Sequence, residues 1–277
     1  MNVNKSPRRY LFFGGHPDDG DEMMGGTAIK LINGGHIVKF VSVCNGDCGH
    51  YSMTPEGLAK RRLAEVENAR VIAGLCEYQI MDNHDCRTFP DQKNRDDIVR
   101  IIRHFQPDVI ISHRIYDYHA DHRATAQLVR DAGYLLKVPL YCPDVPIPEK
   151  NPVFAYSYDR FDESRKFRID AAVEIDSVLE KKKEMLNCHE SQYFEWLPWD
   201  RGQRNFNIDM SDRKIRMAHL ETFIQSMHCP VELARKILLE EYGPVKGAEV
   251  CHCEVFELSD YGRSVSIQEF RELLGAF

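Results

Sequence analysis

Two short segments contain most of the side chains that could carry out chemistry. The first, GHPDDGDEMM at residues 15–24, follows the apolar run of residues 10–13 and brings His16 close to Asp18 and Asp19. The second, YDYHADHRAT at residues 116–125, places His119 and His122 three positions apart, on one face if a helix begins there. Imidazole and carboxylate are ordinary ligands of a zinc-type ion. The first segment alone is equally typical of a helix N-terminus, whose N–H groups donate to aspartates.

The first half of the chain alternates apolar runs with helical patterns, which is typical of βαβ units and a parallel sheet. We expect strands at 9–15, 37–44, 77–82 and 108–113, and helices at 23–33, 55–74, 94–105 and 121–137. The predicted fold class is α/β, a doubly wound, mostly parallel, Rossmann-like sheet. In a strand order such as 3-2-1-4-5, strands 9–15 and 108–113 are neighbours, so the two segments meet at the carboxyl edge.

This meeting of two loops favours a metal site over two unrelated histidine clusters. Four side chains are strong ligand candidates, namely His16, Asp19, His119 and His122, and Asp18 is an adjacent spare acid. Catalytic zinc usually keeps three protein ligands and one water, so the surplus groups are candidates for acid–base roles. We expect Zn²⁺, although Fe²⁺ also suits nitrogen and oxygen ligands.

The second half of the chain is predicted to be an α+β extension that covers the active-site edge. Residues 139–165 contain five prolines up to residue 152 and read as an extended surface excursion. We expect a strand at 171–176, helices at 177–193, 211–227 and 230–241, and a last strand at 249–258. The lysines of 181–183 are expected on a solvated helix face. The prediction is one domain, 1–277, with a core at 1–138 and a dependent cover at 139–277.

Composition narrows the class of protein. The net charge of −7 argues against a nucleic-acid or anionic-membrane surface, so small-molecule chemistry is expected. No stretch approaches the ~18 apolar residues that a membrane span needs. Nine cysteines without C-x-x-C spacing indicate reduced thiols and a cytoplasmic protein. Whether the chain forms a homo-oligomer stays open.

Several motifs together resemble the PIG-L/LmbE-like N-acetylglucosaminyl deacetylase family. They are HPDD after a first strand, GGT nine residues beyond the histidine, R-x-x-E in the second helix, PDVII, and H-x-D-H-R-A-T. The likeness covers about residues 9–132 well. It continues weakly in the tail, at Lys183, His189, Ser191 and Gln192, and in the closing EVFEL.

The resemblance implies a zinc-dependent hydrolase that removes acetyl from the nitrogen of an amino sugar or its conjugate. By position it suggests His16, Asp19 and His122 as zinc ligands, Asp18 as general base, and His119 as the group that stabilises the oxyanion or protonates the amine. Arg62 and Asp85 match the family's substrate contacts only loosely, and Arg62 could equally form an i,i+3 ion pair with Glu65.

One position departs from the family pattern. Members commonly have an acid directly after HPDD, whereas this chain has Gly20, followed by Asp21 and Glu22. We expect Asp21 and Glu22 to cap the helix and the metal site to survive. The loss of the acid can alter ligand basicity or loop rigidity.

Two alternative functions stay open at this stage. One is an amidase that acts on a sugar–thiol or another N-acyl conjugate with the same metal chemistry. The other, of a different class, is a non-catalytic sugar-binding or regulatory protein on the same fold. The aromatic segment YFEWLPW at 193–199 could stack on sugar faces or pack the cover onto the sheet, and packing is preferred.

Overall fold

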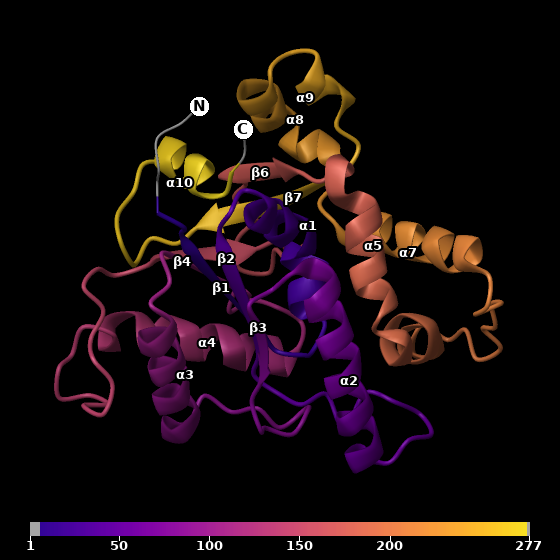
Figure 1. Cartoon of the computed structure of the whole chain (residues 1–277), viewed down its shortest axis with the longest axis horizontal. Coiled ribbons are helices and arrows are strands. Elements are labelled where there is room, and N and C mark those ends of the chain that lie inside the picture. Colours follow the sequence, from indigo (N-terminus) through magenta and orange to yellow (C-terminus); the bar gives the residue numbers. More distant parts are fainter. Residues whose placement is uncertain (1–5, 276–277) are drawn as a thin grey trace.

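The computed structural model describes residues 6–275, so the first five and last two residues of the predicted domain lie outside it. One seven-stranded sheet crosses the molecule in the order β3-β2-β1-β4-β5-β7-β6 (Figure 1). The strands are β1 Arg9–Gly14, β2 Ile37–Ser42, β3 Glu77–Ile80, β4 Val109–Ser112, β5 Val153–Ser157, β6 Ala171–Glu174 and β7 Cys253–Leu258. The first five run parallel, and β7 is antiparallel to both β5 and β6. The doubly wound, mostly parallel sheet is therefore confirmed.

Strand β1 lies in the interior of the sheet, and its side chains are apolar on both faces. Five of its six residues are buried. It pairs with β2 on one side and with β4 on the other, with Tyr10 opposite both Val38 and Val109. The prediction that the first and fourth strands are neighbours is thus confirmed, and both strands end at the same edge.

Helices connect the strands and cover both faces of the sheet (Figure 1). In the first half they are α1 Asp19–Asn33, α2 Pro55–Ala73, α3 Gln92–Phe105 and α4 Ala120–Leu135. In the second half they are α5 Leu179–Asn187, the π-helical turn Ser191–Trp196, α6 Leu197–Asp200, α7 Arg213–Met227, α8 Val231–Tyr242, α9 Lys246–Glu249 and α10 Ile267–Leu273, with a 3₁₀ turn at Asp176–Val178. Helix α2 begins where Thr54 accepts from the N–H of Gly57 and ends at Gly74, whose φ of 85° is left-handed.

The core has one apolar layer on each face of the sheet. Side chains of α1, α2, α5 and α10 pack with Tyr10 and Phe12 of β1 on one face. Side chains of α3 and α4 pack with Leu11 and Phe13 on the other. Successive side chains of β1 thus point alternately into the two layers, as expected for a sheet that is covered on both faces.

Several predicted boundaries in the second half were wrong. The surface excursion predicted at 139–165 contains β5, whose short apolar run VFAYS directly follows Pro152 and is mostly buried beside β4. The last strand begins at Cys253 rather than 249, because residues 246–249 form a helical turn. The helix predicted at 177–193 is divided into a 3₁₀ turn, α5 and the π-helical turn.

The lysine run of α5 is not a solvated face. Lys182 is fully buried, and its Nζ donates to the carboxylate of Glu254 on β7 at 2.5 Å and to the carbonyl of Glu22 on α1 at 2.7 Å. Glu254 also accepts the N–H groups of Gly26 and Thr27. This buried ion pair joins the N-terminal helix to the last strand of the sheet.

Among the described residues, no helix has the length and apolarity needed to cross a bilayer.

Candidate metal centre and active site

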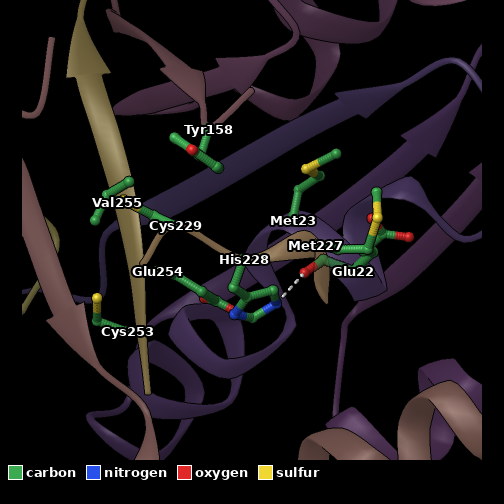
Figure 2. A pocket seen from close by; sticks show the side chains of 9 residues that line it. All are labelled: Glu22, Met23, Tyr158, Met227, His228, Cys229, Cys253, Glu254 and Val255. Carbon is green, nitrogen blue, oxygen red and sulfur yellow. Dashed lines mark hydrogen bonds between the residues drawn. The ribbon is translucent and has the colours of Figure 1, made fainter. Parts of the chain in front are cut away.

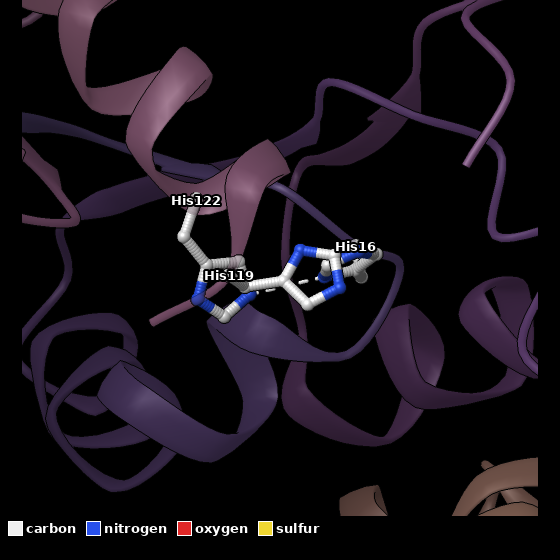
Figure 3. Close-up of side chains that lie close together, drawn as sticks. All are labelled: His16, His119 and His122. Carbon is white, nitrogen blue, oxygen red and sulfur yellow. Dashed lines mark hydrogen bonds between the residues drawn. The ribbon is translucent and has the colours of Figure 1, made fainter. Parts of the chain in front are cut away.

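The turn after β1 and the N-terminus of α4 meet at the carboxyl edge of the sheet (Figure 3). There His16 Nδ1 and His122 Nε2 lie 3.0 Å apart. Asp19 Oδ2 lies 3.3 Å from His122 Nε2 and 3.6 Å from His16 Nδ1. With bonds of ~2.0–2.1 Å, a tetrahedral zinc ion separates its ligand atoms by about 3.3 Å. These three atoms therefore fit a divalent ion of that type.

A glycine allows the two segments to approach so closely. A Cβ atom at Gly15 would lie 2.9 Å from Cδ2 of His122, closer than carbon atoms normally come. The glycine before the histidine in GHPDD thus makes room for the ring that α4 brings in. Loop and helix can meet at this edge only because position 15 has no side chain.

Carboxylates lie at the other nitrogens of the two candidate ligand imidazoles, those of His122 and His16. His122 Nδ1 lies 3.0 Å from Asp117 Oδ1, while His16 Nε2 lies 3.3 Å from Asp85 Oδ1 and 3.5 Å from Asp121 Oδ2. Burial alone lowers the pKa of His122, but Asp19 and Asp117 outweigh it and raise that pKa to about 9. Such carboxylate–histidine pairs fix the ring orientation of metal ligands.

His113 and Asp117 are site residues that the sequence analysis did not single out. His113 Nε2 lies 3.0 Å from Asp19 Oδ2, and its ring stacks on His122 at 4.0 Å between centroids. Burial raises the pKa of Asp19. The neighbouring imidazoles of His113 and His122 outweigh it and keep that pKa well below the ordinary value. Position alone could have indicated His113, because it directly follows β4.

Asp18 is held by an arginine from α2. Arg62 Nη2 donates to Asp18 Oδ1 at 2.7 Å, and Arg62 is almost fully buried. The alternative prediction, an ion pair of Arg62 with Glu65, is wrong, because Glu65 instead accepts from Ser191 and contacts Arg61. Nε and Nη1 of Arg62 have no hydrogen-bond partner among the described residues.

His119 occupies the N-cap of α4, and this fixes its tautomer. Its Nδ1 accepts the N–H of Asp121 at 3.2 Å, so the neutral ring carries its proton on Nε2. Burial, together with the imidazoles of His16 and His122, lowers the pKa of His119. The ring packs edge-on against His16 with centroids 4.4 Å apart (Figure 3).

The predicted site residues and Asp117 border one cavity of about 730 Å³. Its lining includes the predicted residues His16, Asp18, Asp19, Arg62, Asp85, His119 and His122. The cover contributes Gln192, Trp196 and Met227 to the opposite wall. This volume is typical of small-molecule sites. The structure therefore brings every predicted site residue to one cavity.

A smaller cavity of about 20 Å³ adjoins the large one (Figure 2). Glu22, Met23, Tyr158 and Met227 line both. Figure 2 shows the His228 ring against the backbone of Glu22, whose carbonyl oxygen lies 3.2 Å from His228 Nε2. The backbone of Glu22 is thus held by His228, while its side chain borders the large cavity.

Asp21 and Glu22 do not cap α1 as predicted. The helix begins at Asp19, four residues earlier than expected, and no side chain accepts a capping hydrogen bond. Asp21 is buried and accepts from the hydroxyl of Tyr78 at 2.8 Å. Burial and the nearby Asp18 and Asp19 raise the pKa of Glu22 to about 8.

Packing explains Gly20. A Cβ atom there would lie 2.5 Å from the buried ring of Phe40 on β2. This chain therefore has no room for the acid that the family usually carries at this position. Gly20 instead allows α1 to pack closely against the ring of Phe40.

The aromatic side chains of the cover are mostly used for packing. Tyr51, from the loop after β2, stacks on Trp199, and Trp199 stacks on Trp196, each with centroids 5.4 Å apart. These contacts hold the loop against the cover. Trp196 additionally lines the cavity.

Comparisons with known proteins find a family match in the first half of the chain and a deacetylase relative. Residues 11–133 match the family described as GlcNAc-PI de-N-acetylase, or PIG-L. The diacetylchitobiose deacetylase of Thermococcus kodakarensis is 28% identical over 192 residues, which are 67% of this chain and 71% of that protein.

Two solved structures share the fold. N,N'-diacetylchitobiose deacetylase from Pyrococcus horikoshii has a TM-score of 0.67 at 22% identity, over 91% of this chain and 84% of that one. The 4-carboxy-2-hydroxymuconate hydratase GalB from Pseudomonas putida has a TM-score of 0.70 at 18% identity, over 94% and 98%. Because a deacetylase and a hydratase have this fold, the fold alone does not define the reaction. Residues 11–133 of this chain are thus similar to the PIG-L family, and the curated relative is a deacetylase.

Proposed function

We propose that this protein is a metal-dependent hydrolase that removes an N-acetyl group from an amino sugar or its conjugate. The observation that carries the proposal is the set His16, Asp19 and His122, whose ligand atoms lie 3.0–3.6 Å apart beside Asp18 and His119. The family description and the related diacetylchitobiose deacetylase support the reaction and the class of substrate.

His16, Asp19 and His122 would hold the ion. A bound zinc ion would lower the pKa of a water towards ~7 and polarise the acetamide carbonyl. We favour Zn²⁺ because two imidazoles and one carboxylate are an ordinary zinc set, and Fe²⁺ is the alternative. The nine unpaired cysteines support a reducing compartment, and we place the protein in the cytoplasm.

Asp18 acts as the general base. Its Oδ1 is held by Arg62, which leaves Oδ2 to take the proton of the attacking water. The same carboxyl group then gives this proton to the leaving nitrogen. His119 is less suited to protonate that nitrogen, because burial and neighbouring imidazoles favour its neutral form.

His119 stabilises the oxyanion as a neutral donor. Since the N–H of Asp121 occupies Nδ1, the N–H of Nε2 is available to the oxygen that becomes negative during attack. Asp85 and Arg62 line the same cavity and are proposed to bind sugar hydroxyl groups. The products are acetate and a free amino sugar.

Metal analysis combined with an acetate-release screen tests this function. The panel comprises N-acetylglucosamine, N,N'-diacetylchitobiose and an N-acyl sugar–thiol conjugate, each with the purified protein and with chelator-treated protein. We expect one divalent ion per chain, acetate release from an N-acetyl amino sugar, and loss of that release after chelation. Preference for the thiol conjugate would favour the related amidase. Absence of bound metal, and of activity after zinc or iron is added, would contradict the proposal.

A further inference from the structure

We propose that Glu22 binds a hydroxyl group of the substrate's sugar ring and so helps to determine which N-acetyl sugars the site accepts. This inference deepens the proposed function, on which it rests, because it concerns the sugar part of the same substrate. It gives a role to a carboxyl group that neither holds the ion nor transfers a proton in the proposed reaction.

Glu22 borders the cavity from the same face of α1 as Asp19. Asp19, Glu22 and Met23 all line the 730 Å³ cavity. Residues i, i+3 and i+4 share one face of a helix. Three residues advance a helix by about 4.5 Å along its axis. When the acetamide lies at the ion beside Asp19, a sugar ring that extends along α1 therefore brings hydroxyl groups to Glu22.

The backbone of Glu22 is anchored on both sides of its side chain. Its carbonyl oxygen accepts from Lys182 Nζ at 2.7 Å and lies 3.2 Å from His228 Nε2. Its N–H donates to the carbonyl oxygen of Asp18 at 3.0 Å. The side chain thus leaves the helix at a fixed point of the cavity wall, and such rigid support is what a binding residue needs.

The carboxyl group of Glu22 is not used within the described part of the chain. There the hydrogen bonds of Glu22 involve its backbone alone. The neighbouring cation, Lys182, is paired with Glu254. A free carboxyl group on a cavity wall is available to a ligand, and it accepts a hydrogen bond from a hydroxyl group whether or not it carries a proton.

This carboxyl group also costs stability. Burial, together with Asp18 and Asp19, raises the pKa of Glu22 to about 8. A third acid at this place is therefore unfavourable for the fold. Natural proteins keep unfavourable groups of this kind mainly where function needs them.

The wall around Glu22 suits the carbon-bound face of a sugar ring. Glu22, Met23, Tyr158 and Met227 line both the large cavity and the small one that adjoins it (Figure 2). Apolar and aromatic side chains provide contact area, and one polar group among them fixes the orientation of the ligand. Glu22 is the polar group of this part of the wall.

Sugars that each lack one hydroxyl group test the contact. KM and kcat for acetate release are measured with N-acetylglucosamine and its monodeoxy analogues, with bound metal determined for each protein. Glu22→Leu removes the acceptor, and we expect it to raise KM for N-acetylglucosamine about 10–100-fold with little change in kcat. Glu22→Gln still accepts through its amide oxygen and should keep most of the affinity.

One analogue should identify the bound hydroxyl group. For that sugar the native protein and Glu22→Leu should have nearly the same KM, because the contact is already lost. For the other analogues Glu22→Leu should raise KM by the same factor as for N-acetylglucosamine. Glu56→Leu is the control, because Glu56 is exposed on α2 and does not line the cavity, and it should match the native protein with every sugar.

Two results would overturn the role of Glu22. One is an unchanged KM in Glu22→Leu. The other is an equal rise of KM for every sugar, which would show that the substitution disturbs the site without removing a particular contact.

Calorimetric binding of the same sugars separates this role from the proposed function. If no acetate is released, but Glu22→Leu weakens the binding of every sugar except one analogue, the proposed function fails while the contact stands. If Glu22→Leu releases acetate with native KM, the contact fails while the function stands. A native protein that binds none of these sugars would overturn the contact.

Discussion

At the scale of single residues, the site places several carboxylates around a few imidazoles in a buried space. Each imidazole that we propose as a ligand has a carboxylate at its second nitrogen, Asp117 for His122 and Asp121 with Asp85 for His16. This pairing leaves one nitrogen of each ring directed at the shared point beside Asp19. The negative charge that collects there is tolerated only because a cation or protonated rings balance it.

The carboxyl group of Glu22 gives a prediction about pH and stability. In metal-free protein its pKa is about 8, because of burial and of Asp18 and Asp19, whereas in the unfolded chain it is ordinary. Between pH 5 and pH 8 the folded state therefore keeps a proton that the unfolded chain has lost. The free energy of unfolding should fall as pH rises through this window.

Glu22→Gln should lose part of that pH dependence. We expect the variant to be more stable than the native protein. This difference in the free energy of unfolding should be at least about 1 kcal/mol larger at pH 8 than at pH 5. Urea denaturation of chelator-treated protein at both pH values measures it, with the exposed Glu56→Gln as control. An identical pH dependence in the native protein and Glu22→Gln would show that Glu22 is ionised throughout.

At the scale of elements, the sequence allowed the main positions to be predicted. Alternating apolar runs and helix patterns located β1 to β4 and α1 to α4 to within a few residues. The usual strand order then predicts that β1 and β4 are neighbours, so the sequence alone brings His16 and His122 together.

Elements and contacts that depend on tertiary packing could not be predicted. Strand β5 has only five residues and follows a proline-rich loop, so its pattern is too short to distinguish from the loop. Lys182 reads as a solvated lysine until Glu254, 72 positions away, is seen beside it. The stacking of His113 on His122 likewise depends on how α4 enters the site.

The contact between α1 and β2 gives a prediction for Gly20. In a helix, replacing glycine with alanine normally stabilises the fold by about 0.5–1 kcal/mol. Here the new Cβ atom would meet the ring of Phe40 at 2.5 Å, and overpacking of this kind costs about 1–3 kcal/mol. We therefore expect Gly20→Ala to be less stable than the native protein in urea denaturation.

The double variant Gly20→Ala/Phe40→Leu separates the clash from other effects. If the ring causes the loss, Gly20→Ala should cost less in the Phe40→Leu background than in the native one. A stabilised Gly20→Ala protein would show that Phe40 moves freely and that packing does not explain the glycine.

At the scale of the whole molecule, the two halves of the chain are joined by a buried ion pair. Lys182 of α5 bonds to Glu254 of β7, and Glu254 in turn holds the backbone of α1. The cover is thereby fixed against α1, the helix that follows the turn containing His16. That one domain spans residues 1–277, with a dependent cover at 139–277, stays a prediction.

Lys182→Met should destabilise the protein strongly. The change leaves the buried carboxylate of Glu254 without its cation, and breaking a buried pair costs about 3–5 kcal/mol. Urea denaturation measures the loss. Lys181→Met, one position earlier on the same helix, is the control and should lose far less. A similar loss in both variants would mean that helix α5 itself, and not the buried pair, is affected.

The central claim is that Asp18 works as a base beside an ion held by His16, Asp19 and His122. The most direct measurement is acetate release by Asp18→Asn, with bound metal determined on the same sample. The account predicts an unchanged metal content and a rate reduced about 10²–10⁴-fold, because the amide cannot take the proton of the attacking water. Native-like acetate release by Asp18→Asn with its full complement of metal would contradict it.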